Sequence, residues 1–267
     1  SKRIITRKPK IACSFMRVSL SYEYLDFIKL SIYDTIVLVE VNLMMKIFLD
    51  TADVATIKQH YQTGLIDGVT TNPSLIMKSH RHPHEVYEEL IEFGVEDISM
   101  EVTGSTAIEM IAEGEKLVHK FGKQQTTIKV PCTPEGLVAC KELSKQIVRV
   151  NVTLIFSPAQ AILAAKAGAT YISPFVGRVD DNSYGGLCLI KDIANIFAKQ
   201  NVFDCGILGA SIRNVRDVGR AFEYGANICT IPVGVFEKMY KHVLTDAGLA
   251  AFEADYQQTL SEFPLNN

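Results

Sequence analysis

The sequence predicts an α/β protein built as a (β/α)8 TIM barrel with an extra C-terminal helix, and two observations lead to this prediction. From Lys46 onward, short apolar and β-branched runs alternate with amphipathic stretches of helical period. Eight such units fit into about 200 residues, so each is too short to be a separate domain. Strict alternation of this kind predicts a parallel sheet, and eight units close naturally into a barrel.

The expected strands are short, apolar and closed by polar residues. They span 46–50, 66–70, 97–102, 126–130, 149–152, 170–175, 204–208 and 227–231. Helical patterns occupy the gaps, at 53–63, 82–93, 106–121, 134–146, 158–167, 187–199, 214–224 and 233–242. An open doubly wound sheet is the alternative, but it usually carries a glycine-rich turn after its first strand. The turn here is Asp50-Thr51-Ala52-Asp53, without a GxGxxG motif, and this favours the barrel.

A last helix is expected over about 249–260, beyond the eighth unit. Leu249, Phe252, Tyr256 and Leu260 recur every three or four residues and form one apolar stripe. Such a stripe needs a surface that buries it, on the same barrel or on a neighbouring subunit. The helix therefore predicts a homo-oligomer.

Residues 1–44 differ from the rest of the chain, because they begin with a basic stretch and fit no clean helix or strand template. A mitochondrial-type presequence is one interpretation, since no acidic residue precedes Glu23. Another is that Met44 or Met45 is the natural start. We favour the second and interpret 1–44 as an N-terminal extension outside the catalytic domain, which spans 45–267 as a single barrel.

Composition excludes several classes of protein. The chain is 48% hydrophobic and 21% charged, as is ordinary for soluble globular proteins. A net charge of -3 gives no reason to expect a nucleic-acid partner, and no apolar run reaches the ~18 residues of a membrane span. The six cysteines have no CxxC spacing and mostly lie in apolar segments, which indicates free thiols in the cytoplasm. His80, His82 and His84 alternate, but a solvated loop explains them better than a metal site.

Polar residues close most of the expected strands, and chemistry in a barrel takes place where its strands end. The polar residues are Asp50, Asn72, Glu101, Lys129, Asn151, Thr153, Ser173, Arg178, Ser211 and Arg213, and the apolar Phe175 lies among them at the end of the sixth strand. Each alone has a structural explanation: Asp50 or Ser211 could cap the next helix, and Asn72 could make a turn. Their convergence at one end of a barrel instead predicts an active site.

Lys129 lies between Ile128 and Val130, in the middle of an expected strand. An edge-strand lysine that points to water is one interpretation. In an apolar setting the pKa of a lysine falls, and the uncharged amine becomes a nucleophile towards carbonyls. If Lys129 forms a Schiff base with a ketone, Asp50 and Glu101 supply two carboxylates for the separate proton transfers.

A phosphate site is expected near the end of the seventh strand. Arg178 and Arg213 supply guanidinium groups, and Ser211 supplies a hydroxyl beside backbone N–H groups at a helix start. Phosphate sites near the last strands are common in this architecture. The substrate would then be a phosphorylated sugar.

Six motifs in order resemble those of transaldolases. They lie at 45–53 (MKIFLDTAD), 68–74 (GVTTNPS), 127–131 (TIKVP), 151–157 (NVTLIFS), 173–178 (SPFVGR) and 210–213 (ASIR). The chain is most similar to the short, bacterial-type subfamily, which also contains fructose-6-phosphate aldolases. The resemblance covers about 45–260 and leaves 1–44 unexplained.

The resemblance implies a class I aldolase-type barrel without metal or other cofactor. It implies transfer of a dihydroxyacetone unit from sedoheptulose 7-phosphate to glyceraldehyde 3-phosphate, giving erythrose 4-phosphate and fructose 6-phosphate in the pentose phosphate pathway. Lys129 would form the Schiff base, Asp50 would serve C–C cleavage, and Glu101 would activate water with Thr153. Asn72 and Asn151 would bind the substrate hydroxyls, and Ser173 would assist them. The phosphate would be bound by Arg178, Ser211 and Arg213. The subfamily commonly forms pentamers that pair into decamers.

Two positions bear on the choice between transaldolase and aldolase. The aldolase-type members carry glutamine at the Glu101 position and tyrosine at the Phe175 position. Phe175 cannot protonate the bound three-carbon carbanion, so the enamine should persist until an aldehyde acceptor arrives. Both residues favour transaldolase over fructose-6-phosphate aldolase. A non-catalytic phosphosugar sensor is the remaining alternative, but a sensor needs neither Lys129 nor the two carboxylates.

Overall fold

Eight parallel strands close into a barrel in chain order in the computed structural model, which describes residues 45–263. The strands are β1 (Lys46–Asp50), β2 (Gly68–Thr70), β3 (Ile98–Glu101), β4 (Thr126–Pro131), β5 (Arg149–Ile155), β6 (Tyr171–Pro174), β7 (Gly206–Gly209) and β8 (Ile228–Ile231). β1 pairs with both β2 and β8, which closes the barrel. The predicted fold class is therefore confirmed, whereas the prediction for 1–44 lies outside the described residues.

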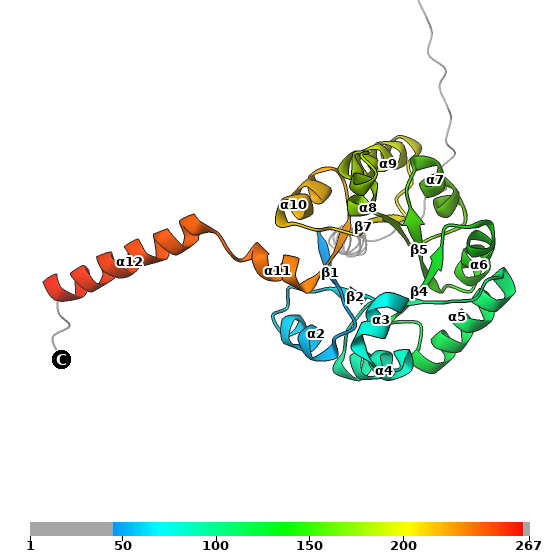
Figure 1. Ribbon diagram of the computed structural model, residues 1–267, viewed down its shortest axis with the longest axis horizontal. Coiled ribbons are helices and arrows are strands. Elements are labelled where there is room, and N and C mark those ends of the chain that lie inside the picture. Colours follow the sequence, from blue (N-terminus) through cyan, green and yellow to red (C-terminus); the bar gives the residue numbers. More distant parts are fainter. Residues whose placement is uncertain (1–44, 264–267) are drawn as a thin grey trace, which may run out of the picture. The chain divides into compact units, whose positions relative to one another are not determined.

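Helices surround the strands on the outside (Figure 1). They are α2 (Val54–Tyr61), α3 (Pro73–Ser79), α4 (Pro83–Phe93), α5 (Ala107–Phe121), α6 (Pro134–Lys145), α7 (Pro158–Lys166), α8 (Val176–Asp181), α9 (Gly186–Gln200), α10 (Val215–Glu223), α11 (Val233–Met239) and α12 (Val243–Glu262). Asp53, Thr106, Thr133, Ser157 and Asn214 each cap a helix through a side-chain oxygen. These caps fix where the chain leaves each strand and enters the next helix.

Two short helices were not expected, and both border the mouth of the barrel. At α3, Asn72 accepts a hydrogen bond from the Leu75 N–H, and Pro73 occupies the first helical position. The Asn-Pro pair thus starts a helix rather than making only a turn. The second is α8, which follows Phe175 and packs against the start of α9: a Cβ on Gly186 would lie 2.2 Å from the Val176 carbonyl oxygen of α8. Close packing of α8 on α9 therefore depends on this glycine.

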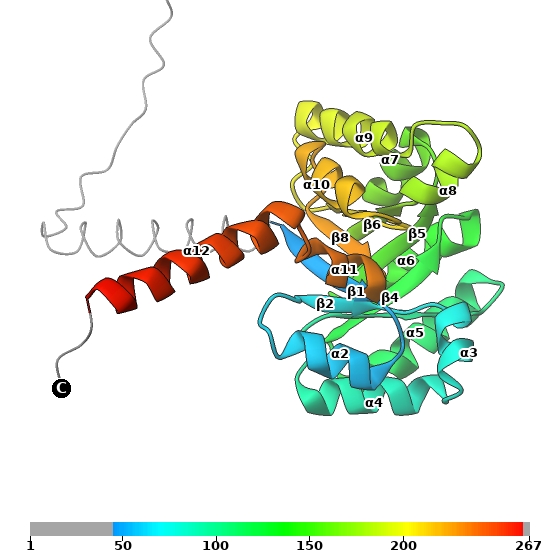
Figure 2. The same ribbon diagram turned by 60° about the vertical axis from the view of Figure 1, so that its left-hand side comes forward.

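The C-terminal helix is longer than expected, since α12 begins at Val243 and not near residue 249. His242 caps it by accepting a hydrogen bond from the Leu244 N–H. The predicted stripe, Leu249, Phe252, Tyr256 and Leu260, is 37% to 73% exposed. Figures 1 and 2 show α12 extending beyond α11, away from the other helices. The barrel of the same chain therefore does not cover the stripe.

The interior of the barrel has a polar side and an apolar side. Inward-facing side chains from β1, β6, β7 and β8 form an apolar cluster of Phe48, Tyr171, Leu208, Ala210 and Ile228. A larger apolar cluster fills the layer between the strands and the helices. On β3, β4 and β5 the inward positions are polar, and because side chains alternate along a strand they stack in layers. The upper layer of these polar groups forms the site described below.

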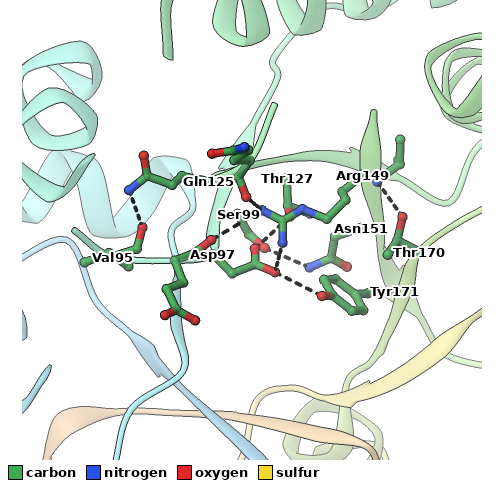
Figure 3. A network of polar contacts seen from close by, with 12 residues as sticks. Val95, Asp97, Ser99, Gln125, Thr127, Arg149, Asn151, Thr170 and Tyr171 are labelled. Carbon is green, nitrogen blue, oxygen red and sulfur yellow. Dashed lines mark hydrogen bonds and ion pairs between the residues drawn. The ribbon is translucent and has the colours of Figure 1, made fainter. Parts of the chain in front are cut away.

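The lower end of the barrel, where the strands begin, is closed by a polar network around Asp97 (Figure 3). The buried Asp97 carboxylate accepts hydrogen bonds from Thr127 Oγ1 (2.7 Å), Arg149 Nη1 (2.9 Å) and the Tyr171 hydroxyl (3.0 Å). Arg149 also donates to the Gln124 carbonyl oxygen (2.5 Å). Burial raises the pKa of Asp97, while Arg149 and the two hydroxyl groups oppose that rise. The network ties β3, β4, β5 and β6 together below the site.

The five cysteines within residues 45–263 are all free thiols. Burial raises the pKa of Cys140, Cys205 and Cys229 to about 12, so these three remain protonated at neutral pH. In that part of the chain, no helix combines the length and apolar character needed to cross a membrane.

Candidate active site

A cavity of about 320 Å³ opens at the C-terminal ends of the strands. Nine of the eleven residues expected from the sequence line it: Asp50, Asn72, Glu101, Lys129, Thr153, Ser173, Phe175, Arg178 and Ser211. The remaining two, Asn151 and Arg213, lie next to the cavity without lining it. Residues from β1 to the segment after β7 therefore converge as the sequence suggested.

Lys129 is 6% exposed, although an ammonium group is costly to bury without partners. Its Nζ lies 3.0 Å from Glu101 Oε2 and donates a hydrogen bond to the Thr71 carbonyl oxygen at 3.0 Å. The parallel register pairs Glu101 with Lys129 across β3 and β4, so both side chains point into the barrel at the same height. Lys129 is therefore an interior residue and not an edge-strand lysine in water.

Asp50 lies at the end of β1 and faces the same cavity. Its Oδ1 accepts a hydrogen bond from Thr70 Oγ1 (2.9 Å), and that hydroxyl also lies 2.6 Å from Thr230 Oγ1. Burial raises the pKa of Asp50, and the positive charges of Lys129 and Arg178, with the Thr70 hydrogen bond, oppose that rise. A raised pKa suits a carboxylate that exchanges protons near neutral pH. Helix α2 is capped by Asp53, so Asp50 is free for this task.

Strand β5 contributes two residues to the site, Thr153 and Asn151, at different heights inside the barrel. Thr153 is 1% exposed, and its Oγ1 has no hydrogen-bond partner among residues 45–263. A buried hydroxyl that lines a polar cavity is suited to hold a water molecule or a substrate oxygen there. Asn151 lies one layer lower, accepts a hydrogen bond from Ser173 Oγ (2.7 Å) and donates to Ser99 Oγ (3.3 Å). It supports the floor of the site from below.

The rim of the cavity carries the predicted phosphate-binding groups. The guanidinium of Arg178 stacks on the ring of Phe175, 4.9 Å from its centroid, and Phe175 also packs against Phe156. Ser211 lines the cavity in a left-handed conformation (φ 58°). Helix α10 is capped by Asn214, so the Ser211 hydroxyl is not used as a cap.

Arg213 is held at the rim by Asp181 of α8. Both terminal nitrogens of the guanidinium donate to the two carboxylate oxygens, and each side chain is about half exposed. The stem of Arg213 lies across Gly177, where a Cβ would approach its Nε to 2.6 Å. Arg213 therefore lies beside Arg178 and Ser211, with its two terminal nitrogens bound to a carboxylate.

Several residues that shape the site were not predicted to be site residues. Thr70, at the end of its predicted strand, donates a hydrogen bond to Asp50. Its hydroxyl in turn contacts that of Thr230, the polar member of the apolar strand β8. Leu154 lines the cavity within β5, and Asp181 restrains Arg213. Among residues 45–263 no group of three or more His, Cys, Asp or Glu side chains is placed to hold a metal ion.

A closed parallel barrel with a polar cavity at the carboxyl ends of its strands is the arrangement found in enzymes of the (β/α)8 class. Residues 47–265 match the model of one family, transaldolase/fructose-6-phosphate aldolase. The chain belongs to this family.

Similar proteins have the same length as the barrel portion of the chain. A probable transaldolase of Paracoccus denitrificans is 52% identical over 215 residues, which are 80% of this chain and 98% of that protein. One from Nitrosopumilus maritimus is 46% identical over 220 residues, 82% of this chain and 98% of that protein. One from Caulobacter vibrioides is 49% identical over 215 residues, with 80% and 98% covered.

Proposed function

We propose that the protein is a transaldolase that transfers a dihydroxyacetone unit through a Schiff base on Lys129. The donor would be sedoheptulose 7-phosphate and the acceptor glyceraldehyde 3-phosphate, in the pentose phosphate pathway of the cytoplasm. The observation that carries the proposal is the amine of Lys129, buried in a cavity that also holds two carboxylates. The family of the chain and the names of its relatives support the same reaction.

In the first half of this reaction, Lys129 Nζ attacks the ketone carbon and water leaves, which gives a protonated imine. Glu101, 3.0 Å from Nζ, is placed to move protons during the loss and return of that water, with Thr153 holding the water. Asp50 takes the proton of the hydroxyl on the carbon beyond the bond that breaks. The aldehyde product leaves, and the electron pair of the broken bond enters the imine to form an enamine.

In the second half, the enamine carbon attacks the carbonyl of the acceptor aldehyde. Asp50 returns its proton to the new hydroxyl, and water hydrolyses the imine to free Lys129. Arg178, Ser211 and Arg213 at the rim fit the phosphate that donors and acceptors share, because guanidinium groups bind phosphate with charge-assisted hydrogen bonds. Asn72, Asn151 and Ser173 are assigned to the substrate hydroxyls between these two ends.

Borohydride trapping tests the proposal. With fructose 6-phosphate, reduction should fix a three-carbon adduct on Lys129, identified by peptide mass spectrometry. An adduct on another lysine, or none in an active preparation, would refute the assignment. Measurable sugar-phosphate binding without any turnover would favour a phosphosugar sensor instead.

Fructose-6-phosphate aldolase is the second function to test, because it belongs to the same family. Phe175 argues against it, since a phenyl ring beside the site cannot donate a proton to the enamine. We therefore expect turnover to depend on an acceptor aldehyde. Rapid release of free dihydroxyacetone without an acceptor would contradict the transaldolase assignment.

A homo-oligomer, pentameric or decameric, is part of the same proposal. Its support is the exposed apolar stripe of α12, which the barrel of the same chain does not cover. Light scattering at micromolar concentration should give a mass well above that of one 29.6 kDa chain. A monomer mass would contradict this part of the proposal.

A further inference from the structure

Leu154 adopts an unusual backbone conformation near the end of β5. Its φ is 61°, in the left-handed region that a branched residue such as leucine rarely occupies. The pairing register between β5 and β6 shifts at this point, between Val152 and Ile155, as in a β-bulge. A conformation of this kind carries strain, and such strain tends to persist where it serves a functional site.

The bulge reverses the side-chain alternation of β5. Thr153 faces the cavity, so a regular strand would turn Leu154 outward and Ile155 inward. Instead, Ile155 is fully buried in the outer apolar cluster, together with Val152. Leu154 packs in neither apolar cluster and lines the cavity beside Thr153. Two consecutive side chains of one strand therefore border the site.

Most of the residues that line the cavity around Lys129 are polar. The lining contains two large apolar side chains, Leu154 and Phe175, from the adjacent strands β5 and β6. Polar walls bring water close to the bound intermediate, whereas apolar walls keep it away. The bulge thus adds a hydrocarbon side chain to the wall of the cavity that holds Lys129, next to Thr153.

We propose that Leu154 determines the partition of the Lys129 enamine between transfer to an aldehyde and protonation by water; this rests on the function proposed above. In the unwanted reaction, the enamine carbon takes a proton from water and becomes an imine. A water molecule then adds to that imine, and dihydroxyacetone leaves as Lys129 regains its amine. Leu154 suppresses the first of these steps by excluding water from the carbon that would be protonated.

Leu154 variants separate the side chain from the backbone strain. Leu154→Ala removes most of the wall and keeps the strain, whereas Leu154→Gly removes both, because glycine adopts a positive φ without penalty. Leu154→Met keeps an apolar side chain of similar volume. The quantity to measure is the rate of dihydroxyacetone release from fructose 6-phosphate divided by the rate of transfer to an acceptor. A coupling enzyme removes glyceraldehyde 3-phosphate during the release assay.

The expected result is a higher ratio in both truncated variants and a ratio near that of the wild type in Leu154→Met. We expect a rise on the order of tenfold, which corresponds to about 1.4 kcal/mol in relative barrier height. Ile147→Gly is the matched control, since Ile147 has the same conformation (φ 59°) and is 85% exposed outside the cavity. It relieves equal strain and should leave the ratio unchanged.

The outcomes separate this inference from the proposed function. If the wild type and the variants all trap the adduct on Lys129 and the ratio stays constant, Leu154 does not control partition. If only Leu154→Gly changes the ratio, the strain acts and the wall does not, which also overturns the inference. If the wild type traps no adduct on Lys129, the proposed function itself is wrong. Melting curves on every variant confirm that folded protein is compared.

Discussion

Two carboxylate–cation pairs lie at opposite ends of the same barrel, and they have opposite surroundings. At the lower end, Asp97 binds Arg149 within a network that uses both carboxylate oxygens. At the upper end, Glu101 binds Lys129 at the wall of an open cavity. The two carboxylates are four residues apart along β3, so both face the interior. A carboxylate with both oxygens bonded to neighbouring strands holds those strands together, whereas a carboxylate beside open space can exchange partners with a substrate.

The comparison predicts that the upper pair can be removed without loss of folding. Lys129→Met should abolish adduct formation and lower turnover by at least about 10⁴-fold, because no other group in the site can form the imine. Its melting temperature should change little, because the Glu101 carboxylate that loses its partner lines an open cavity and can be hydrated there. A coupled turnover assay and a circular dichroism melt provide the two measurements. Lys58→Met, which breaks an ion pair with Glu89 far from the cavity, should leave turnover unchanged.

Asp50 extends the comparison to pH. Burial raises the pKa of Asp50, and the carboxylate must be ionised to accept a proton. On acidification kcat/KM should therefore begin to fall at a pH above the pKa of an exposed aspartate, which is near 3.9. Asp50→Asn should lower kcat by roughly 10²–10⁴-fold and remove this acid limb. A group whose folded pKa is raised contributes stability below its unfolded pKa and loses it as pH rises through the folded pKa. Asp50→Asn should therefore be at least as stable as the wild type at pH 7.

Unfolding and activity are both measured across the pH range for this variant. An unchanged acid limb in Asp50→Asn would show that another group carries the proton. A lower melting temperature at pH 7 would show that Asp50 stabilises the site rather than strains it.

The lower pair should show the reverse behaviour. Asp97→Ala leaves Arg149 without its counter-charge and the Thr127 and Tyr171 hydroxyls without their acceptor. This loss outweighs the relief of the buried charge that the raised pKa of Asp97 indicates, and it should lower the free energy of unfolding by about 3 kcal/mol. For a barrel of this size that corresponds to roughly 6–12 °C in Tm. Turnover per folded molecule should stay close to that of the wild type. Calorimetry gives Tm, and Glu223→Gln, which breaks an exposed pair with Arg220, is the control with a loss below about 1 kcal/mol. A large loss of kcat without a change in Tm would contradict the division between the two ends.

The smallest effect is expected at the rim, where Asp181 holds Arg213. Asp181→Asn frees the guanidinium for phosphate and should lower KM for sedoheptulose 7-phosphate. Exposed pairs contribute at most about 1 kcal/mol, so the change should not exceed about fivefold. Steady-state kinetics with unphosphorylated fructose provide the control, because that substrate has no phosphate to gain from Arg213. A higher KM for the phosphorylated donor would show that Asp181 positions Arg213 rather than competes for it.

Local sequence patterns were sufficient to predict the barrel. Each strand is a compact apolar run with a polar end, so its position follows from composition alone, and the polar ends meet at one face because all strands are parallel. For the same reason nine expected residues surround one cavity. Their roles in the reaction remain predictions.

The parts that the sequence did not reveal depend on long-range geometry. Thr70 meets Asp50 across the β1–β2 pair, and the Thr230 hydroxyl reaches that of Thr70 only because the barrel closes between β8 and β1. The contact of Asp181 with Arg213 requires α8, a short helix that begins without a side-chain cap. The bulge at Leu154 has no glycine or asparagine to mark its positive φ. Strand β5 consequently runs to Ile155, three residues beyond its predicted end.

The closed lower end of the barrel also constrains the order in which substrates bind and products leave. Phe48, Leu208 and Ile228 fill the interior, and the network around Asp97 blocks the floor. Within residues 45–263 the cavity is reached from the strand ends alone. Under the proposed reaction, the first aldehyde must leave through the opening by which the second enters. A protein built on this plan would bind its two substrates in turn, and plots of initial rate at several acceptor concentrations would be parallel lines.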